Sequence, residues 1–258
     1  MGEPTNSHRN VLVTGSARRI GKAIATGLAI DGWNVAVHYN RSAADAQQLV
    51  AHIESLGVRA TAVQCDLTRT DAVSELIGEC VRRLGPLSCM VNNASLFEFD
   101  DPVGFDPEKW EQHAAINLRA PLLLVRAFAQ QVPDDTTGCV VNMLDQKVFN
   151  LNPDFFSYTL TKVAMEGATR MLAMALAPRV RVCGVAPGIT LVSGQQTEDG
   201  FERAHTRAPL GRSSDVGDIV EAVRYVIAAK SMTGHTVVVD GGQHLWPSQR
   251  DVQFEVKS

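Results

Sequence analysis

The sequence predicts an α/β protein: a single-domain, Rossmann-type, doubly wound parallel sheet of about seven strands, with helices on both faces. Short β-branched runs alternate with longer helical patterns along the whole chain, as in consecutive βαβ units. The strand candidates are almost continuously apolar, which is typical of a sheet covered on both faces. A length of 258 residues suits one domain of this kind.

The strand candidates are short apolar runs, at 10–14, 34–39, 58–64, 87–92, 138–144, 180–186 and 235–240. Helical periodicity fills the intervals between them, at 20–31, 43–56, 70–84, 107–131, 155–177 and 214–229. Because crossovers between parallel strands are right-handed, these units predict a doubly wound sheet. We expect residues 1–9 to be a flexible tail and residues 10–258 to form the domain.

Two long irregular stretches, about 93–106 and 187–212, follow the fourth and sixth strand candidates. In open α/β sheets, ligands bind beyond the carboxyl ends of the strands. We therefore expect these stretches to carry the substrate site, with 189–212 as a mobile cover.

Composition argues against several classes of partner. A net charge of -4 and a pI near 6.0 provide no basic field for nucleic acid. No apolar run approaches the roughly 20 residues that span a bilayer, and the first residues lack an apolar signal core. The five cysteines are widely spaced, without a CxxC pair for metal or redox chemistry. The sequence predicts a cytoplasmic protein with buried thiols, no metal, and no membrane or nucleic-acid partner.

The first strand candidate runs into the turn Thr14-Gly15-Ser16-Ala17-Arg18-Arg19-Ile20-Gly21 and then into a helix. Backbone N–H groups and the dipole at a helix N-terminus bind anions, so this turn suits the pyrophosphate of a dinucleotide. A turn with two glycines can also be purely structural. Its position at the first strand of a βαβ series favours the nucleotide.

The residues after the second strand candidate decide between NAD and NADP. A carboxylate there would bond to a free ribose 2′-hydroxyl and repel a 2′-phosphate. This chain reads His38-Tyr39-Asn40-Arg41-Ser42, with no carboxylate before Asp45. The Arg41 guanidinium can pair with a phosphate and the Ser42 hydroxyl can donate to it. NADPH is the predicted cofactor.

Tyr158 and Lys162 stand four residues apart on a predicted helix, and hence on one face. The Lys162 charge and an oxidised nicotinamide would stabilise a phenolate, so we expect the Tyr158 pKa to be lowered. Tyr158 would then supply a proton as hydride arrives from NADPH. Lys162 would also hold the nicotinamide ribose. A surface pair without a role is the alternative interpretation.

The glycine turn, the Tyr158-to-Lys162 spacing, a Pro187-Gly188 loop and the Asp240-Gly241-Gly242 ending together resemble the short-chain dehydrogenase/reductase family over nearly the whole chain. The resemblance implies an NADP-dependent oxidoreductase, usually a homotetramer. It implies a proton-relay role for Asn117 and an adenine contact for Asp66, although Asp66 can instead cap the following helix.

Together, the residues and the resemblance predict cofactor contacts at Gly15, Arg19, Ile20, Gly21, His38, Tyr39, Asn40, Arg41, Ser42, Asp66, Leu67, Asn93, Ala94, Ser95, Tyr158, Lys162, Pro187 and Gly188.

Four departures from the common family motifs resemble the pteridine reductases and dihydromonapterin reductases. Arg19 replaces the middle glycine of the turn, and that resemblance implies that it reaches both cofactor phosphate and substrate. Ser95 and Phe97 follow Asn92-Asn93-Ala94 where the common motif has glycine. Ser95 would contact the cofactor phosphate and a pterin edge. Phe97 would stack on a flat heterocycle, or simply cover the site.

The fourth departure is Asp145, which stands 13 positions before Tyr158, where most family members have serine. An ionised carboxylate cannot donate to a ketone oxygen, but it can accept from the N–H groups of a pterin. Asp145 can also help Tyr158 pass a proton to a ring nitrogen. The predicted substrate contacts are Arg19, Ser95, Phe97, Asp145 and Tyr158.

We therefore expect NADPH-dependent reduction of dihydropterins, with dihydrofolate as a secondary substrate. A reductase of another carbonyl, such as a 3-oxoacyl thioester, is the alternative enzyme. A non-catalytic NADPH-binding regulator is the alternative from a different class.

Overall fold

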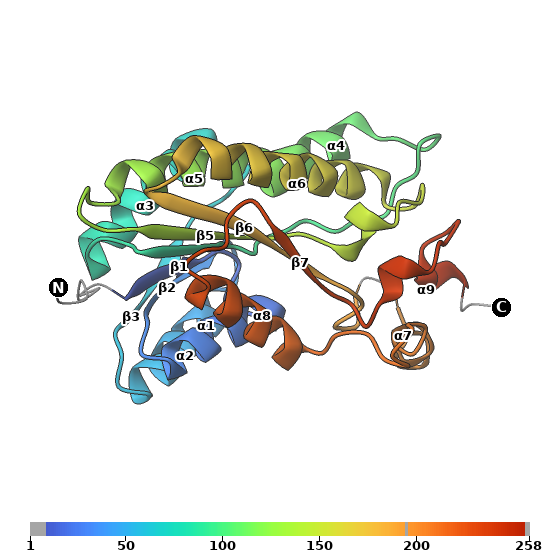
Figure 1. Cartoon of the computed structure of the whole chain (residues 1–258), viewed down its shortest axis with the longest axis horizontal. Coiled ribbons are helices and arrows are strands. Elements are labelled where there is room, and N and C mark those ends of the chain that lie inside the picture. Colours follow the sequence, from blue (N-terminus) through green and yellow to red (C-terminus); the bar gives the residue numbers. More distant parts are fainter. Residues whose placement is uncertain (1–8, 194–195, 256–258) are drawn as a thin grey trace.

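The computed structural model describes residues 9–193 and 196–255 and contains one seven-stranded sheet (Figure 1). All neighbouring strands are parallel, in the order β3-β2-β1-β4-β5-β6-β7, so the predicted doubly wound sheet is confirmed. The strands are β1 (Asn10–Val13), β2 (Asn34–Tyr39), β3 (Ala60–Gln64), β4 (Cys89–Asn92), β5 (Gly138–Met143), β6 (Val180–Pro187) and β7 (Thr236–Val239).

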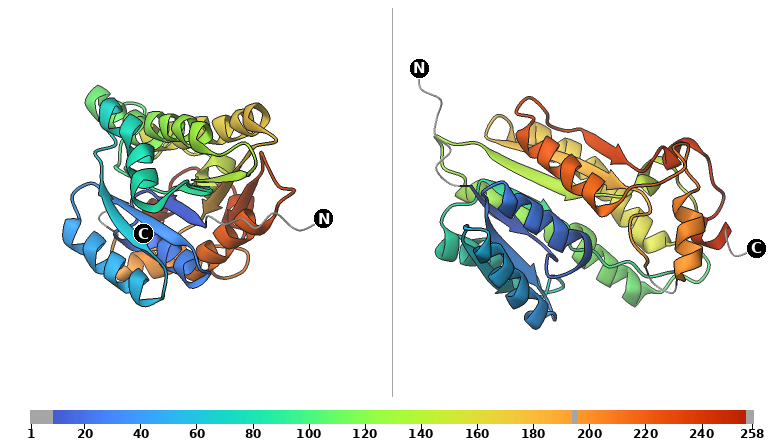
Figure 2. Two further views of the ribbon diagram at one scale, coloured as in Figure 1. Left: turned by 90° about the vertical axis from the view of Figure 1, so that its left-hand side faces the viewer. Right: turned by 90° about the horizontal axis from the view of Figure 1, so that it is seen from below.

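Helices cover both faces of the sheet (Figure 1 and Figure 2). One layer contains α1 (Arg19–Ile30), α2 (Ala43–Ser55) and α8 (Val216–Ala228). The opposite layer contains α3 (Thr70–Leu84), α4 (Pro107–Ala114), α5 (Ala120–Gln131) and α6 (Phe156–Leu176). Alternate side chains of β1 enter opposite cores: Val11 and Val13 face one layer, and Leu12 faces the other. Both faces of the strands are therefore buried, as their continuous apolar sequence predicts.

The predicted helix at 107–131 is interrupted. A π-helix, Ala115–Arg119, separates α4 from α5. Pro121 has no N–H to donate to the carbonyl of residue 117, and its ring would clash with that carbonyl in a regular α-helix. The wider turn relieves this conflict, and it carries Asn117 toward the site.

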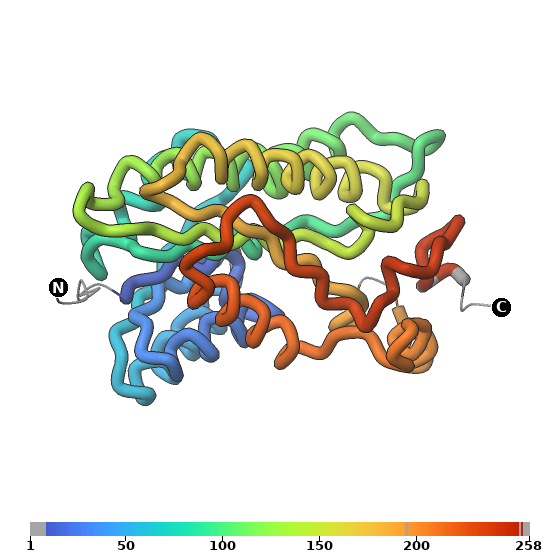
Figure 3. The backbone as a smooth tube through the Cα atoms, viewed as in Figure 1, coloured from blue at the N-terminus to red at the C-terminus, as the bar shows by residue number. Residues whose placement is uncertain are grey.

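Several short elements at the carboxyl ends of the strands are absent from the sequence prediction: the 3-10 helices η2 (Gln146–Phe149) and η3 (Gln243–Leu245), and helices α7 (Glu198–His205) and α9 (Val252–Glu255). Helix α7 lies within the stretch predicted to be irregular. Figure 3 shows the segment after β7 beside α7 at one end of the molecule, and α7 contacts α9.

Two predictions concern the start of the chain and its cysteines. Residues 1–8 of the predicted tail lie outside the described residues. Arg9 is already part of the fold, because its carbonyl accepts a hydrogen bond of 2.7 Å from the Asn34 N–H. All five cysteines are buried and free, as predicted. No helix in 9–193 or 196–255 combines the length and the apolar character needed to cross a bilayer.

Candidate active site

The glycine turn between β1 and α1 is clamped against the loop after β4. The Thr14 hydroxyl oxygen accepts from the Asn93 and Ala94 N–H groups, both at 2.9 Å, and the Asn93 amide donates to the Thr14 carbonyl at 2.8 Å. Gly15 has φ +61°, and a Cβ there would lie 2.9 Å from the Ala94 Cα. The close approach and the positive φ both require glycine.

His38 supports this turn from within the fold. Its buried ring accepts from the Gly15 N–H through Nδ1 at 2.9 Å, and its Nε2 lies 3.1 Å from the Cys65 carbonyl oxygen. Burial lowers the His38 pKa to about 4. The ring is therefore neutral, with its proton on Nε2, and its side chain holds the turn in place rather than offering a charge to a ligand.

Arg19 has an unusual backbone for a residue with a side chain. Its φ is +54°, in the left-handed region where a Cβ is strained. The motif that this turn resembles has glycine here, a residue that adopts such a φ without strain. Its exposed side chain borders both cavities described next. Neighbouring Arg18 instead pairs with Asp45 at 2.6 Å on the surface.

Two adjoining cavities lie at the carboxyl ends of the strands, one of about 490 Å³ along the glycine turn and one of about 210 Å³ beyond it. Their shared lining includes Arg19, Ser95, Phe97, Asp145 and Tyr158. The other predicted residues that border the larger cavity are Gly15, Ile20, Gly21, His38, Asn40, Leu67, Asn93 and Ala94. Lys162, Pro187 and Gly188 border the smaller one. The sequence prediction thus collects residues from the ends of six strands, β1 to β6, around one space.

Four predicted cofactor residues, Tyr39, Arg41, Ser42 and Asp66, do not line either cavity. Arg41 is exposed just beyond β2. Asp66 accepts from the Thr68 N–H at 3.0 Å and the Thr68 hydroxyl at 2.8 Å, and these bonds lower its pKa. Since α3 begins at Thr70, Asp66 stabilises the preceding turn and does not cap the helix.

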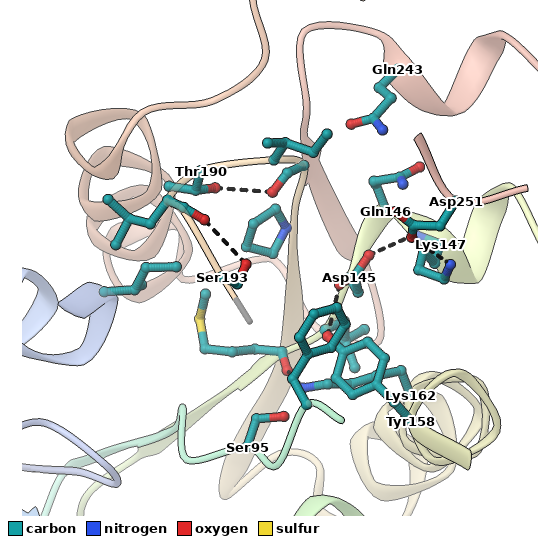
Figure 4. A pocket seen from close by; sticks show the side chains of 18 of the residues that line it. Ser95, Asp145, Gln146, Lys147, Tyr158, Lys162, Thr190, Ser193, Gln243 and Asp251 are labelled. Atoms are coloured by element: carbon teal, nitrogen blue, oxygen red, sulfur yellow. Dashed lines mark hydrogen bonds and ion pairs between the residues drawn. The ribbon is translucent and has the colours of Figure 1, made fainter. Parts of the chain in front are cut away.

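Tyr158 and Lys162 point from α6 toward Asp145 at the end of β5 (Figure 4). The phenol donates to Asp145 Oδ2 at 2.7 Å, and the Lys147 N–H donates to Asp145 Oδ1 at 2.9 Å. Lys162 donates to the Met143 carbonyl at 2.7 Å, and its Nζ lies 5.5 Å from the centroid of the Tyr158 ring. The three side chains predicted to act together therefore form one cluster.

The electrostatics of this cluster differ from the prediction. Burial, followed by the Asp145 charge, raises the Tyr158 pKa well above its usual value. Burial also raises the pKa of Asp145 and lowers that of Lys162 to about 8. In the protein alone, burial and the adjacent carboxylate thus set the direction of the Tyr158 pKa, and a lowering beside an oxidised nicotinamide stays a prediction. The phenol keeps its proton, as a proton donor must.

Asn117 is buried and its carboxamide is fully engaged. Its oxygen accepts from the Leu96 N–H at 2.8 Å, and its nitrogen donates to the Leu96 carbonyl at 2.9 Å and the Thr161 hydroxyl at 3.2 Å. These bonds tie the loop after β4 to α6, and thus fix Ser95 relative to Tyr158. A proton-relay role for Asn117 stays a prediction.

Phe97 lies between the two cavities in an aromatic cluster that includes Phe155. The Phe97 and Phe155 rings stack with centroids 4.2 Å apart and planes 14° apart, and Phe97 meets Tyr158 edge-on at 4.7 Å. Packing fixes the orientation of Phe97, so its ring is a rigid part of the cavity wall.

The structure adds wall residues that the sequence prediction missed: Gln146, Lys147, Gln243, Asp251 and Val252. Lys147 and Asp251 form a buried ion pair of 2.8 Å, although they are 104 positions apart. No local pattern could identify a pairing across such a separation. The adjacency of Gln146 to Asp145 was the one available signal.

Comparisons with known proteins agree with this geometry. A family model described as short chain dehydrogenase matches residues 9–202. A crystal structure of FolM alternative dihydrofolate reductase 1 from Brucella suis, in complex with NADP, is 44% identical, with a TM-score of 0.90, and the match covers 93% of this chain and 96% of that chain. Pteridine reductase 1 of Leishmania tarentolae is 34% identical, covering 91% of this chain and 96% of that protein. The 3-oxoacyl-acyl-carrier-protein reductase FabG of Staphylococcus epidermidis is 30% identical, covering 92% of this chain and all of that protein.

Proposed function

The chain belongs to the short-chain dehydrogenase family, and from that premise we propose that it is an NADPH-dependent oxidoreductase that reduces dihydropterins, and secondarily dihydrofolate, to their tetrahydro forms. The observation that carries this proposal is the hydrogen bond from the Tyr158 phenol to Asp145. A carboxylate at that position suits a substrate rich in N–H groups and disfavours a simple ketone.

The glycine turn fits a dinucleotide phosphate. Among the described residues, no side chain caps the N-terminus of α1, so its first N–H groups are available to an anion. A Cβ at Gly21 would lie 2.5 Å from the Gly15 carbonyl oxygen, so this close-packed turn has no room for side chains. Arg41, exposed beyond β2, is the candidate partner for a 2′-phosphate.

Bound NADPH supplies hydride to the substrate ring. In this proposal the chain's own residues hold the ring and manage the proton. Phe97 and Arg19 flank the heterocycle, and Asp145 accepts from its N–H groups. Tyr158 donates the proton that balances hydride addition. Asp145 orients the phenol, and Lys162 holds the nicotinamide ribose.

Two relatives support this choice of substrate class, since the FolM structure and pteridine reductase 1 are 44% and 34% identical to this chain, compared with 30% for FabG. The FabG likeness keeps a 3-oxoacyl thioester reductase as the second candidate. The two candidates differ at Asp145, because a thioester ketone requires a proton donor at that position.

The test is a substrate panel followed by NADPH absorbance, with dihydrobiopterin, dihydromonapterin, dihydrofolate and an acetoacetyl thioester. We expect wild type to oxidise NADPH with the dihydropterins, and Asp145→Ser to lose at least tenfold in kcat/KM for them, about the value of one charge-assisted hydrogen bond. Background rates with every pterin, or faster turnover of the thioester by wild type, would remove the pterin assignment.

We also propose that the protein works as a cytoplasmic homotetramer. Support comes from the exposed apolar side chains of α6, where Met171 and Met174 are 71% and 83% exposed, and from the absence of disulfides among the described cysteines. Light scattering coupled to size-exclusion chromatography should give a mass about four times that of the chain; a monomer mass would reject the tetramer.

A further inference from the structure

Two buried glutamines that line the smaller cavity have carboxamide oxygens without a hydrogen-bond partner among the described residues. Gln146 begins η2 directly after Asp145, and Gln243 begins η3 after β7. They are 7% and 8% exposed, and both line the cavity. Among the described residues, neither Oε1 atom has a hydrogen-bond partner. Figure 4 shows both side chains on the same side of the pocket as Asp251.

Such groups are unusual in a folded protein. Leaving a buried polar atom without a partner costs about 1–3 kcal/mol, and native structures contain few of them. Gln131 shows the ordinary arrangement in this same chain: its carboxamide accepts from the Leu87 N–H at 2.9 Å and donates to the Leu87 carbonyl at 2.8 Å. The contrast indicates that the Gln146 and Gln243 oxygens have room for a partner that residues 9–193 and 196–255 do not provide.

The surroundings restrict the chemistry of that partner. The charged groups beside the two glutamines in the lining of the 210 Å³ cavity are already engaged: Lys147 and Asp251 form a buried ion pair of 2.8 Å, and the Asp145 carboxyl accepts from the Tyr158 phenol and the Lys147 N–H. A terminal amide can present either its oxygen or its NH₂ group by rotation. A hydroxyl both donates and accepts, so it matches either orientation. An apolar acyl chain would leave both amides unsatisfied.

The available space favours a short group. A third cavity, of about 60 Å³, borders the same two glutamines, and Asn150 and Asn152 extend its amide-rich lining. Arg250 at its edge is already paired with Asp154 at 2.8 Å. Arg207 also borders this cavity. The experiment must therefore distinguish an uncharged substituent from an anionic one.

We propose that Gln146 and Gln243 are specificity-determining residues that bind a short, uncharged, hydroxylated substituent of the substrate, at the end away from the reacting ring. The identity of that ring rests on the proposed function. Dihydropterins with a hydroxylated side chain are therefore preferred to dihydrofolate, whose substituent is long, aromatic and anionic.

The test keeps the ring constant and varies the substituent. 6-Methyl-dihydropterin, dihydrobiopterin, which carries a dihydroxypropyl group, and dihydrofolate are compared in wild type, Gln146→Met, Gln243→Met and Gln131→Met. Methionine keeps the length of the side chain and removes its hydrogen bonds. We expect each pocket variant to raise the ratio of the dihydrobiopterin KM to the 6-methyl-dihydropterin KM by about 3- to 10-fold, because one neutral hydrogen bond is lost. The kcat values should change little.

A thermal melt separates specificity from structure. Because Gln146 and Gln243 have no described partner, the two pocket variants should melt no lower than wild type. Gln131→Met should melt several degrees lower with the KM ratio unchanged. An unchanged KM ratio in both pocket variants, a melting temperature lowered as in Gln131→Met, or a wild-type preference for dihydrofolate would overturn the proposal.

A binding measurement distinguishes failure of this proposal from failure of the proposed function. If wild type turns over no dihydropterin, the proposed function is rejected, and the Kd values of biopterin and 6-methylpterin for the NADP-loaded protein decide the glutamine site. Tighter binding of biopterin, lost in Gln243→Met, supports the site. Equal binding of the two pterins overturns it.

Discussion

The two halves of the site satisfy their polar groups in opposite ways. In the half built by the ends of β1, β2 and β4, Thr14, His38 and Asn93 are bonded to other parts of the fold. In the half built by the ends of β5 to β7, burial raises the pKa of Asp145, and the Gln146 and Gln243 oxygens have no hydrogen-bond partner within the described part of the chain. In the first half the fold satisfies these side chains and leaves mainly the backbone N–H groups of α1 for a ligand, whereas the second half retains side-chain bonding capacity near the reacting ring. Arg19, strained and adjacent to both cavities, lies at the boundary.

The largest expected effect lies in the half of the site built by the ends of β5 to β7. Tyr158→Phe removes the phenol that donates to Asp145, and loss of a general acid lowers kcat by about 10²- to 10⁴-fold. Steady-state NADPH oxidation measures this. Tyr225→Phe on the exposed surface of α8, where the side chain is 58% exposed, is the matched control. A loss smaller than tenfold in Tyr158→Phe would mean that the proton comes from elsewhere.

The next effect is a pH dependence. Burial lowers the Lys162 pKa from 10.5 to about 8, so its charge should be lost above that pH, and kcat/KM should fall about tenfold per pH unit. Because the folded-state pKa lies below the unfolded value, the unfolded chain binds this proton more tightly. The stability contributed by this group therefore rises as pH increases from about 8 toward 10.5. A kcat/KM profile that stays level to pH 9.5 would contradict the assignment.

In the half of the site built by the ends of β1, β2 and β4, a substitution should mainly lower the stability of the protein. Thr14→Val leaves the N–H groups of Asn93 and Ala94 without their acceptor, which should lower the free energy of unfolding by about 2 kcal/mol or more. Denaturant titration measures this. Thr14→Ser keeps the hydroxyl and should restore most of the loss. Equal stability of the valine and serine variants would show that these two bonds contribute little.

The smallest effect tests the boundary residue. Arg19→Gly and Arg19→Ala both remove the guanidinium, but only glycine relieves the strain at φ +54°. The free energy of unfolding of the glycine variant should exceed that of the alanine variant by up to about 1 kcal/mol. This difference is the relieved backbone strain minus the entropy that glycine adds to the unfolded chain. We expect both variants to lose NADPH affinity to a similar degree, measured by fluorescence titration. A more stable alanine variant would argue against backbone strain.

The sequence predicted those helices and strands that depend on local patterns of apolar residues. Six predicted helices and seven predicted strands have counterparts in the structure, and the 70–84 helix matches α3 at both ends. The break at Ala115–Arg119 was missed because the apolar periodicity continues through it; Pro121 was the available signal. Helix α7 was missed because its eight residues follow a long polar stretch.

Some features of the candidate site could likewise be predicted from the sequence, and others could not. Tyr158 and Lys162 could be predicted to lie together because four positions on a helix place them on one face. Asp145 was identified through the family resemblance, which implies a serine 13 positions before the tyrosine. The direction of the Tyr158 pKa could not be predicted, because it depends on burial by the folded chain. Phe155 stacking on Phe97 and the Lys147–Asp251 pair arise only when distant segments meet.

The ion pair between Lys147 and Asp251 has a practical consequence for handling the protein. Asp251 and Val252 line the smaller cavity, and Arg250 is held by Asp154, so the last described turn of chain is part of the wall around the reactants. An affinity tag fused to the carboxyl terminus would pull on that wall, whereas an amino-terminal tag would be attached before β1, at the amino ends of the strands and away from the wall. Kinetic constants from the two tagged forms should differ, and the amino-terminal fusion should reproduce those of the untagged enzyme.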